Sequence, residues 1–292
     1  MSKNCLFFSC HGGQKDFFEK GLHVAVRSAR LTNPHLPVFI LHDGLSGSEK
    51  NTLEGCHLIE VDGAVFETGI RNDLTRAAYF KLYAEKLEGY DMALYLDSDL
   101  VVLDNLDDIF NNEGPLAARR EQFGLSHDFT NADQVAKDEK IPNEGAFMNS
   151  GVVCFDLRYW REKKLLEQAL GVAKKYGWDC FKNADQGILN ILAHRTGGFV
   201  ELPVIYNYLR WPDMMCNVVW KARKNKQGYI APVVLRRFQQ KIASFGVSDS
   251  VFGAPMAKIV HWNGPVKPWQ FGREEDRDKL YGACYEQFVS GV

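Results

Sequence analysis

Short apolar runs alternate with helical patterns along the first third of the chain, and this alternation limits the folds available to it. Runs typical of buried strands lie at 5–8, 37–41, 57–61 and 92–96. Between them, apolar residues recur three or four positions apart, as in Phe18, Leu22 and Ala25, and helices are also expected at 48–53 and around 74–82. Strands that alternate with helices usually pair in parallel and are covered by those helices. The sequence therefore predicts an α/β fold with a mainly parallel sheet flanked by helices.

The rest of the chain has a less regular pattern. Here the sequence predicts a strand at 151–157, an amphipathic helix at 158–175, a short helix at 185–193 and a late strand at 257–262. No internal repeat or low-complexity linker divides the 292 residues. A chain of this length can bury one large core, so we expect a single domain over 1–292.

Charge and cysteine content exclude several classes of protein. The chain has 35 basic and 37 acidic residues, a formal net charge of −2, so it lacks the basic surplus of a whole-domain nucleic-acid binder. Its seven cysteines include no Cys-x-x-Cys pair, unlike a disulfide framework or a zinc site. The sequence begins with too short an apolar stretch for a secretory leader, and no run approaches the ~18 residues of a membrane span. We expect a cytoplasmic protein.

Two aspartates follow the most apolar of the expected strands. Ala93–Leu96 runs directly into Asp97 and Asp99. In an extended chain, residues two apart share a face, and the carboxyl ends of strands are where open α/β sheets bind ligands. Two neighbouring carboxylates repel unless a cation lies between them or one is protonated. A divalent-metal site and a turn whose aspartates cap backbone amides both fit this pattern.

A histidine leaves the late strand and opens a second polar segment, His261 to Trp269. His261 could supply an imidazole nitrogen to a metal, Gly264 permits close approach of the backbone to a ligand, and Lys267 carries a charge suited to phosphate. A structural histidine in a packed turn is the alternative. Two aspartates and one histidine form a mixed oxygen and nitrogen set that suits Mn²⁺ or Mg²⁺ better than a structural zinc.

Two further clusters carry amide and carboxylate groups. Asn149 lies just ahead of a strand, where it could bind sugar hydroxyls or simply form a turn. Asp185 and Gln186 would suit a polyol ligand, or would cap the helix that starts there.

The order of these motifs resembles glycosyltransferase family 8. The matching pieces are Asp97-Ser98-Asp99, Asn149-Ser150-Gly151-Val152, Asp185-Gln186-Gly187 and the His261, Gly264, Lys267-Pro268-Trp269 series. The resemblance implies a GT-A fold, Rossmann-like, with a smaller acceptor-side region. It also implies retaining transfer of a hexose, glucose or galactose, from a UDP-sugar to a saccharide or glycolipid acceptor. The implied cofactor is Mn²⁺, with Mg²⁺ as the alternative.

The resemblance also implies a role for each matching residue. The implied metal ligands are Asp97, Asp99 and His261. The implied donor-binding residues are Asp16, Phe18, Lys81, Ser98, Asn149, Asp185, Gln186, Gly264 and Lys267. The implied catalytic residues are Lys81, Asp185 and Gln186. The domain would comprise a nucleotide-binding half at 1–110, a donor-sugar and acceptor half at 111–270 and a C-terminal tail at 271–292.

One insertion, 214–248, is unusual in its charge. It holds seven basic residues and no acidic one, so the rest of the chain holds 28 basic and 37 acidic residues, a net charge of −9. A basic face on an acidic protein attracts anionic partners. We expect this segment to contact an anionic acceptor or, peripherally, the inner face of a membrane; a solvated surface loop is the alternative.

Two other functions fit parts of the pattern. One is a non-catalytic module of the same fold that binds nucleotide-sugars or carbohydrate. The other is a phosphatase in which Asp97 acts as the nucleophile, although such a motif usually follows the first strand and here comes after about three.

Overall fold

The computed structural model describes residues 3–66, 75–121, 123–142, 145–209, 257–263 and 267–269. Its strands are β1 (Asn4–His11), β2 (Val38–Asp43), β3 (His57–Glu60), β4 (Met92–Leu96), β5 (Leu100–Val102), β6 (Leu116–Glu121), β7 (Phe147–Asp156), β8 (Val200–Glu201), β9 (Tyr208–Leu209) and β10 (Ile259–His261). Its α-helices are α1 (His23–Thr32), α2 (Gly47–Thr52), α3 (Leu125–Asp128), α4 (Ala132–Glu139), α5 (Leu157–Glu162), α6 (Leu165–Tyr176) and α7 (Asp185–Arg195). A π-helix lies at Phe17–Leu22 and 3₁₀ helices at Gly63–Val65, Arg76–Lys86, Asp107–Asn111, Trp178–Cys180 and Val204–Tyr206.

Seven of these strands form one sheet, in the order β3-β2-β1-β4-β7-β6-β8. Strands β3, β2, β1 and β4 pair in parallel, β7 runs antiparallel to β4 and β6, and β8 is parallel to β6. The predicted α/β fold with a mainly parallel sheet is therefore confirmed.

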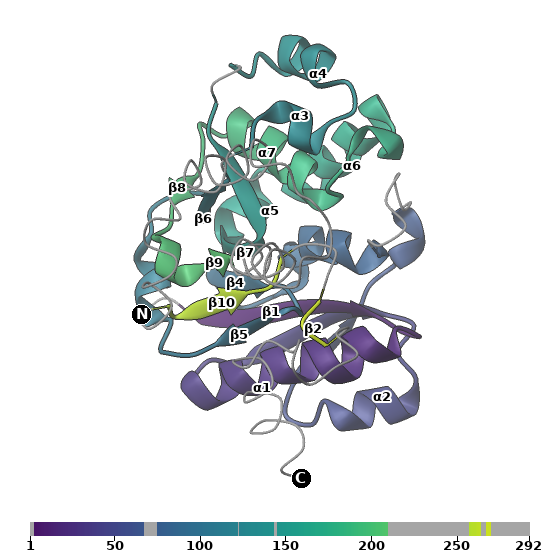
Figure 1. The fold of residues 1–292 in the computed structure, drawn as a ribbon, viewed down its shortest axis with the longest axis vertical. Helices are drawn as coiled ribbons and strands as arrows, with labels where there is room; N and C mark the ends of the chain where they lie inside the picture. The colour runs from purple at the N-terminus through teal and green to yellow at the C-terminus, as the bar shows by residue number, and fades with distance from the viewer. Residues whose placement is uncertain are drawn as a thin grey trace, which may run out of the picture.

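The sheet has helices on both faces, as Figure 1 shows with α1 and α2 on one side and α5, α6 and α7 on the other. Strand β1 shows why, since it is buried on both faces. Its Cys5 and Phe7 belong to the core under α5, α6 and α7, whereas Leu6 and Phe8 belong to the core under α1. Alternate residues of a strand point to opposite faces, so an unbroken apolar run requires cover on both.

Two of the expected elements differ clearly from their predicted bounds, and β6 was not expected at all. The single helix expected at 158–175 is two helices, α5 and α6, because the helical backbone is interrupted at Lys164, whose φ is 51°. Strand β7 begins at Phe147, four residues before the expected start, because the buried Phe147 and Met148 continue its pairing with β6.

A smaller sheet of three strands holds β5, β10 and β9 in that order. Strand β10 pairs antiparallel with β5 and parallel with β9. Because β5 follows β4 after three residues, this sheet brings β10, which ends at His261, beside the end of β4.

Within the described residues, no helix is both long and apolar enough to span a membrane. The insertion 214–248 and the tail 271–292 lie outside those residues.

Candidate metal and sugar-nucleotide site

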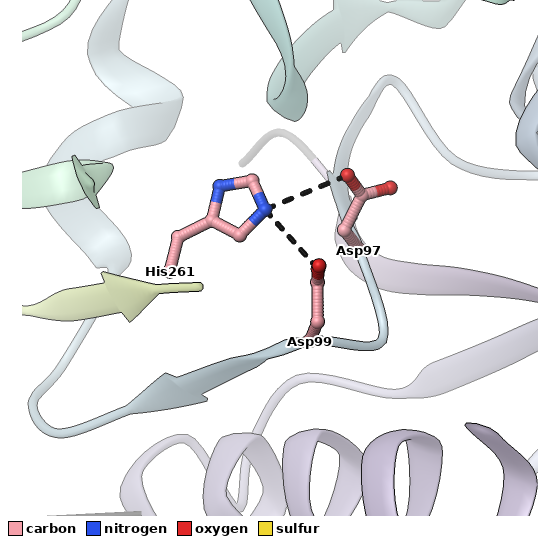
Figure 2. A group of neighbouring side chains, drawn as sticks. All are labelled: Asp97, Asp99 and His261. Atoms are coloured by element: carbon pink, nitrogen blue, oxygen red, sulfur yellow. Dashed lines mark hydrogen bonds and ion pairs between the residues drawn. The ribbon is translucent and has the colours of Figure 1, made fainter. Parts of the chain in front are cut away.

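The paired aspartates lie in a turn between two strands. Strand β4 ends at Leu96 and β5 begins at Leu100, so the chain turns at Ser98 and Asp99 instead of staying extended. Main-chain hydrogen bonds hold the turn: the Asp97 N–H donates to Gly151 O and the Trp262 N–H donates to Asp99 O, both at 2.9 Å. Both carboxylates nevertheless face the same imidazole (Figure 2).

Asp97, Asp99 and His261 converge on one point. The Nε2 atom of His261 lies 3.1 Å from Oδ1 of Asp99 and 3.7 Å from Oδ2 of Asp97. One ligand atom from each residue lies within 4.8 Å of the other two. Two carboxylates and an imidazole are donors that suit Mn²⁺ or Mg²⁺. The three residues therefore fit the cation that the sequence motifs imply.

Because Gly151 has no side chain, the His261 imidazole can lie directly against its backbone. A Cβ atom at this position would lie 2.2 Å from Cε1 of His261 and 2.8 Å from Oδ2 of Asp97. Only a residue without a side chain can lie behind these two groups, so the glycine of the Asn149-Ser150-Gly151 motif is a steric requirement of the cluster.

Asp99 is buried and remains charged because Lys267 and His261 adjoin it. Burial raises its pKa, but the Lys267 ammonium and His261 outweigh that effect and hold the pKa well below its ordinary value. The Lys267 ammonium donates directly to Oδ2 of Asp99. Lys267 was predicted to contact a diphosphate, and it lies against a metal-site carboxylate in the same cavity. Gly264 lies outside the described residues.

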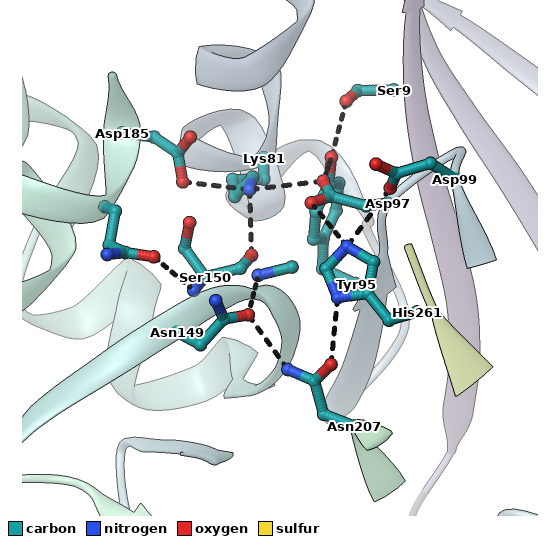
Figure 3. A network of polar contacts seen from close by, with 12 residues as sticks. Ser9, Lys81, Tyr95, Asp97, Asp99, Asn149, Ser150, Asp185, Asn207 and His261 are labelled. Carbon is teal, nitrogen blue, oxygen red and sulfur yellow. Dashed lines mark hydrogen bonds and ion pairs between the residues drawn. The ribbon is translucent and has the colours of Figure 1, made fainter. Parts of the chain in front are cut away.

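Lys81 is buried at the centre of the polar network in Figure 3. Its Nζ atom lies 2.9 Å from Oδ2 of Asp185 and 3.6 Å from Oδ1 of Asp97, and it donates to the Ser150 carbonyl at 2.8 Å. The Tyr95 ring lies beneath it, with the centroid 4.1 Å away. One buried ammonium therefore links the Asp97 carboxylate to the Asp185 carboxylate.

Asp185 has an unusual electrostatic environment. Burial raises its pKa to about 6; Lys81 acts in the opposite sense, and the nearby Asp97 carboxylate adds to the rise. Helix α7 begins at Asp185, directly after Ala184, whose φ is 49°. A non-glycine residue in this region of φ stores strain that the surrounding structure must hold, and such strain commonly marks functional sites.

The side-chain amides of Gln186 and Asn149 form hydrogen bonds through both their oxygen and their nitrogen atoms. Gln186 donates to Oδ1 of Asp128 at 2.8 Å and accepts from the Ser150 N–H at 3.2 Å. Asn149 donates to Oε2 of Glu121 at 3.2 Å. Its Oδ1 accepts from the Gly151 N–H at 3.1 Å and from Nδ2 of Asn207 at 2.9 Å. Each amide is therefore held in one orientation.

Asp128, Glu121 and Asn207 are buried and were missed at the level of sequence. Asp128 accepts from Gln186 and also from Asn190 at 3.0 Å. The available signal was weak: a polar residue among apolar or aromatic neighbours, as in the Tyr206-Asn207-Tyr208 run.

The candidate site is a cavity of about 1060 Å³, near the upper end of ligand-site volumes. The predicted residues that line it are Asp16, Phe18, Lys81, Asp97, Ser98, Asp99, Asn149, Asp185, Gln186, His261 and Lys267. Asp16 is exposed and pairs with Lys20 at 2.8 Å, whereas Phe18 is mostly buried and packs edge-on against His23.

Sequence comparison places the chain among known proteins. The family model "Glycosyl transferase family 8" matches residues 46–230. The chain is similar to the lipopolysaccharide 1,2-glucosyltransferase of Escherichia coli K12, with 32% identity over 199 residues, 67% of this chain and 49% of that protein. It thus spans about half the length of that relative. It is also similar to general stress protein A of Bacillus subtilis 168, with 20% identity over 85% of this chain and 82% of that protein.

Structural comparison concerns the fold alone. The galactosyltransferase LgtC, solved in complex with donor and acceptor sugar analogues, superposes with a TM-score of 0.68 and 18% identity. The match covers 99% of this chain and 96% of that one. The fold predicted from the motif order is therefore the fold observed.

Proposed function

The chain belongs to glycosyl transferase family 8, and on this basis we propose that it is a metal-dependent, retaining hexosyltransferase. The proposed donor is a UDP-sugar carrying glucose or galactose, and the proposed acceptor is a saccharide or glycolipid. The observation that carries the proposal is the convergence of Asp97, Asp99 and His261 on one side of the cavity. Their donor atoms lie close enough together to hold one cation.

In this proposal Asp97, Asp99 and His261 hold Mn²⁺, with Mg²⁺ as the alternative. When bound, the divalent cation supplies positive charge that neutralises the departing diphosphate. Lys267 and Gly264 are assigned to the same diphosphate. Lys267 already contributes a fixed positive charge beside Asp99, at the place where negative charge would develop.

The reaction exchanges one bond at the anomeric carbon for another. The bond between this carbon and the UDP oxygen breaks, and its electron pair leaves with UDP. The acceptor hydroxyl oxygen forms the new bond and its proton is released to solvent, so that the products are the glycoside, UDP and one proton. The sugar becomes oxocarbenium-like in between. Asp185 is assigned to stabilise that positive charge, because its carboxylate is buried next to the cavity and oriented by Lys81 at 2.9 Å.

The other predicted residues of the cavity are assigned either to the nucleotide or to the donor sugar. Asp16, Phe18 and Ser98 are proposed to contact the nucleotide, and Asn149 and Gln186 the donor sugar. Gln186 is a neutral amide with hydrogen bonds at both ends, which supports a role in positioning the sugar. We also propose the division into a nucleotide-binding half at 1–110, a donor-sugar and acceptor half at 111–270 and a tail at 271–292.

The direct experiment is a panel of UDP-sugars assayed for UDP release. We expect UDP release that EDTA abolishes and Mn²⁺ restores, and an α-linked product from the α-linked donor by NMR. Asp99→Asn should reduce turnover at least ~10²-fold, whereas Asp133→Asn, on the exposed side of α4, should not. Release of inorganic phosphate would favour the phosphatase, and a folded chain that binds UDP-sugars without turnover would favour the binding module.

A further inference from the structure

Asn207 lies beside the candidate metal ligand His261 because of how the small sheet is built. It directly precedes β9, and β9 pairs in parallel with β10, so that Tyr208 lies opposite Val260. Asn207 is fully buried. Its Oδ1 atom lies 2.9 Å from Nδ1 of His261, on the ring nitrogen away from the aspartates (Figure 3).

The orientation of the Asn207 amide follows from a backbone N–H group two hydrogen bonds away. The Gly151 N–H can only donate, so the Asn149 atom that faces it must be an oxygen. That same oxygen receives the Asn207 side chain at 2.9 Å, so Asn207 must present its NH₂ group there. The carbonyl oxygen of Asn207 is therefore the atom that faces Nδ1 of His261, and Nδ1 must donate.

We propose that Asn207 is a positioning residue that keeps the proton of His261 on Nδ1. In the neutral imidazole, the lone pair is then on Nε2, the atom that faces Asp97 and Asp99 at 3.7 and 3.1 Å. A histidine ligand bonds through an unprotonated nitrogen, and the partner of its other nitrogen decides which one that is. This inference rests on the proposed metal site and names the group that prepares His261 for it.

The main chain of Asn207 is held as well as its side chain. Its carbonyl oxygen accepts from Nη1 of Arg119 at 2.8 Å. Strand β6 shifts register between Ala118 and Arg120, and such bulges redirect a side chain. The shift makes Arg119 available to this contact. The Asn207 N–H donates to Val204 O at 3.2 Å. Asn207 is therefore held by Asn149, Arg119, Val204 and His261.

The experiment compares the affinity for Mn²⁺ alone, measured from the paramagnetic resonance of the free ion, in four variants. We expect His261→Ala to weaken binding, and Asn207→Leu to weaken it about 10- to 100-fold. The double variant should bind no more weakly than His261→Ala, because Asn207 acts through His261. Asn33→Leu is the matched control. Asn33 is also fully buried, and its Oδ1 accepts from the Leu106 N–H outside the cavity, so its loss should leave Mn²⁺ affinity unchanged.

The outcomes separate this inference from the proposed metal site. Unchanged Mn²⁺ affinity in His261→Ala would refute the metal site itself. Weakened binding in His261→Ala but not in Asn207→Leu would refute the role of Asn207, as would losses that add in the double variant.

A measurement on the unsubstituted chain applies even where the leucine variant does not fold. Nitrogen-15 NMR of the Mg²⁺-loaded protein, with the His261 signal assigned from its absence in His261→Ala, should show a proton on Nδ1. A bare Nδ1 overturns the inference, whereas protons on both nitrogens under Mg²⁺ contradict the metal site.

Discussion

Gly151 shows how much one missing side chain contributes to the site. Its φ is not positive, so any residue could adopt this backbone, and only the contact with His261 and Asp97 demands glycine. We expect Gly151→Ala to displace the imidazole or the strand behind it. Mn²⁺ affinity and UDP-sugar turnover should fall at least about tenfold, the loss caused by disturbing the support of a metal ligand.

The matched control is Gly171→Ala, since an added Cβ there has open space around it. Gly171 lies within α6, where alanine favours the helix by roughly 0.5–1 kcal/mol. This variant should keep full activity, and the midpoint of its unfolding should shift to a slightly higher urea concentration. Equal Mn²⁺ affinity in Gly151→Ala and Gly171→Ala would show that the imidazole tolerates the extra carbon.

The sequence indicated some site residues and missed others for a physical reason. Asp97, Asp99 and His261 follow apolar strands, so local pattern alone places them at a sheet edge. Asn207 instead contacts His261, 54 positions away, and is oriented by Asn149, 58 positions away. No local pattern encodes a contact between β7, which holds Asn149, and the residue before β9, because only the folded chain brings the two together. The finer roles assigned by the family resemblance stay predictions.

At the scale of elements, strands buried on both faces were the easiest to predict. Strand β6 was missed because it ends in Arg119, Arg120 and Glu121, which resemble a polar loop. Two of these charges face inward because they hold Asn207 and Asn149. Strand β6 therefore carries charged residues that contact the site at positions where a strand is usually recognised by apolar residues.

Glu139 at the end of α4 joins three helices. Its carboxylate receives two hydrogen bonds from Arg195 of α7, at 2.8 and 2.9 Å, and others from Lys175 and Tyr176 of α6, at 2.9 and 2.7 Å. Burial raises its pKa, but these hydrogen bonds outweigh burial and lower it to about 2. Because the folded pKa lies below the ordinary value of 4.5, the charged form stabilises the fold above pH ~4.5.

We therefore expect Glu139→Gln to lower the free energy of unfolding by about 1–2 kcal/mol at pH 7. The difference from the unsubstituted protein should shrink as pH falls from ~4.5 towards ~2, because the wild-type carboxylate is then protonated. Urea unfolding at several pH values measures this. Glu162→Gln is the control, since Glu162 forms an exposed pair with Lys163 and should change nothing. A pH-independent difference would contradict the role of the charge.

At the scale of the whole molecule, charge is unevenly distributed along the chain. The segment 214–248 carries seven basic residues, and the remainder carries a net charge of −9. We expect a swap of Lys221, Arg223, Lys224 and Lys226 to Glu to leave hydrolysis of the UDP-sugar unchanged. Transfer to an anionic acceptor, or binding to anionic vesicles, should fall and become less sensitive to salt.

The measurement is donor hydrolysis beside vesicle co-sedimentation at low and high salt. A matched set of four lysines on the described surface and outside the cavity, Lys50, Lys86, Lys137 and Lys174, changed in the same way, controls for net charge. If both sets of substitutions weaken vesicle binding equally, the insertion has no special role and is a solvated surface loop.

The small sheet that carries His261 has a consequence for the order in which the protein matures. Asp99 and His261 are 162 positions apart in the chain, and Lys267 is 168 from Asp99. A ribosome adds residues at about 5–20 per second, so the seven-stranded sheet emerges seconds before β10 does. Until then the two aspartates lack both the imidazole and the lysine. The candidate metal site is therefore completed only when β10 has been synthesised. A chain whose synthesis stops ahead of β10 buries most of its core and still lacks a complete metal site.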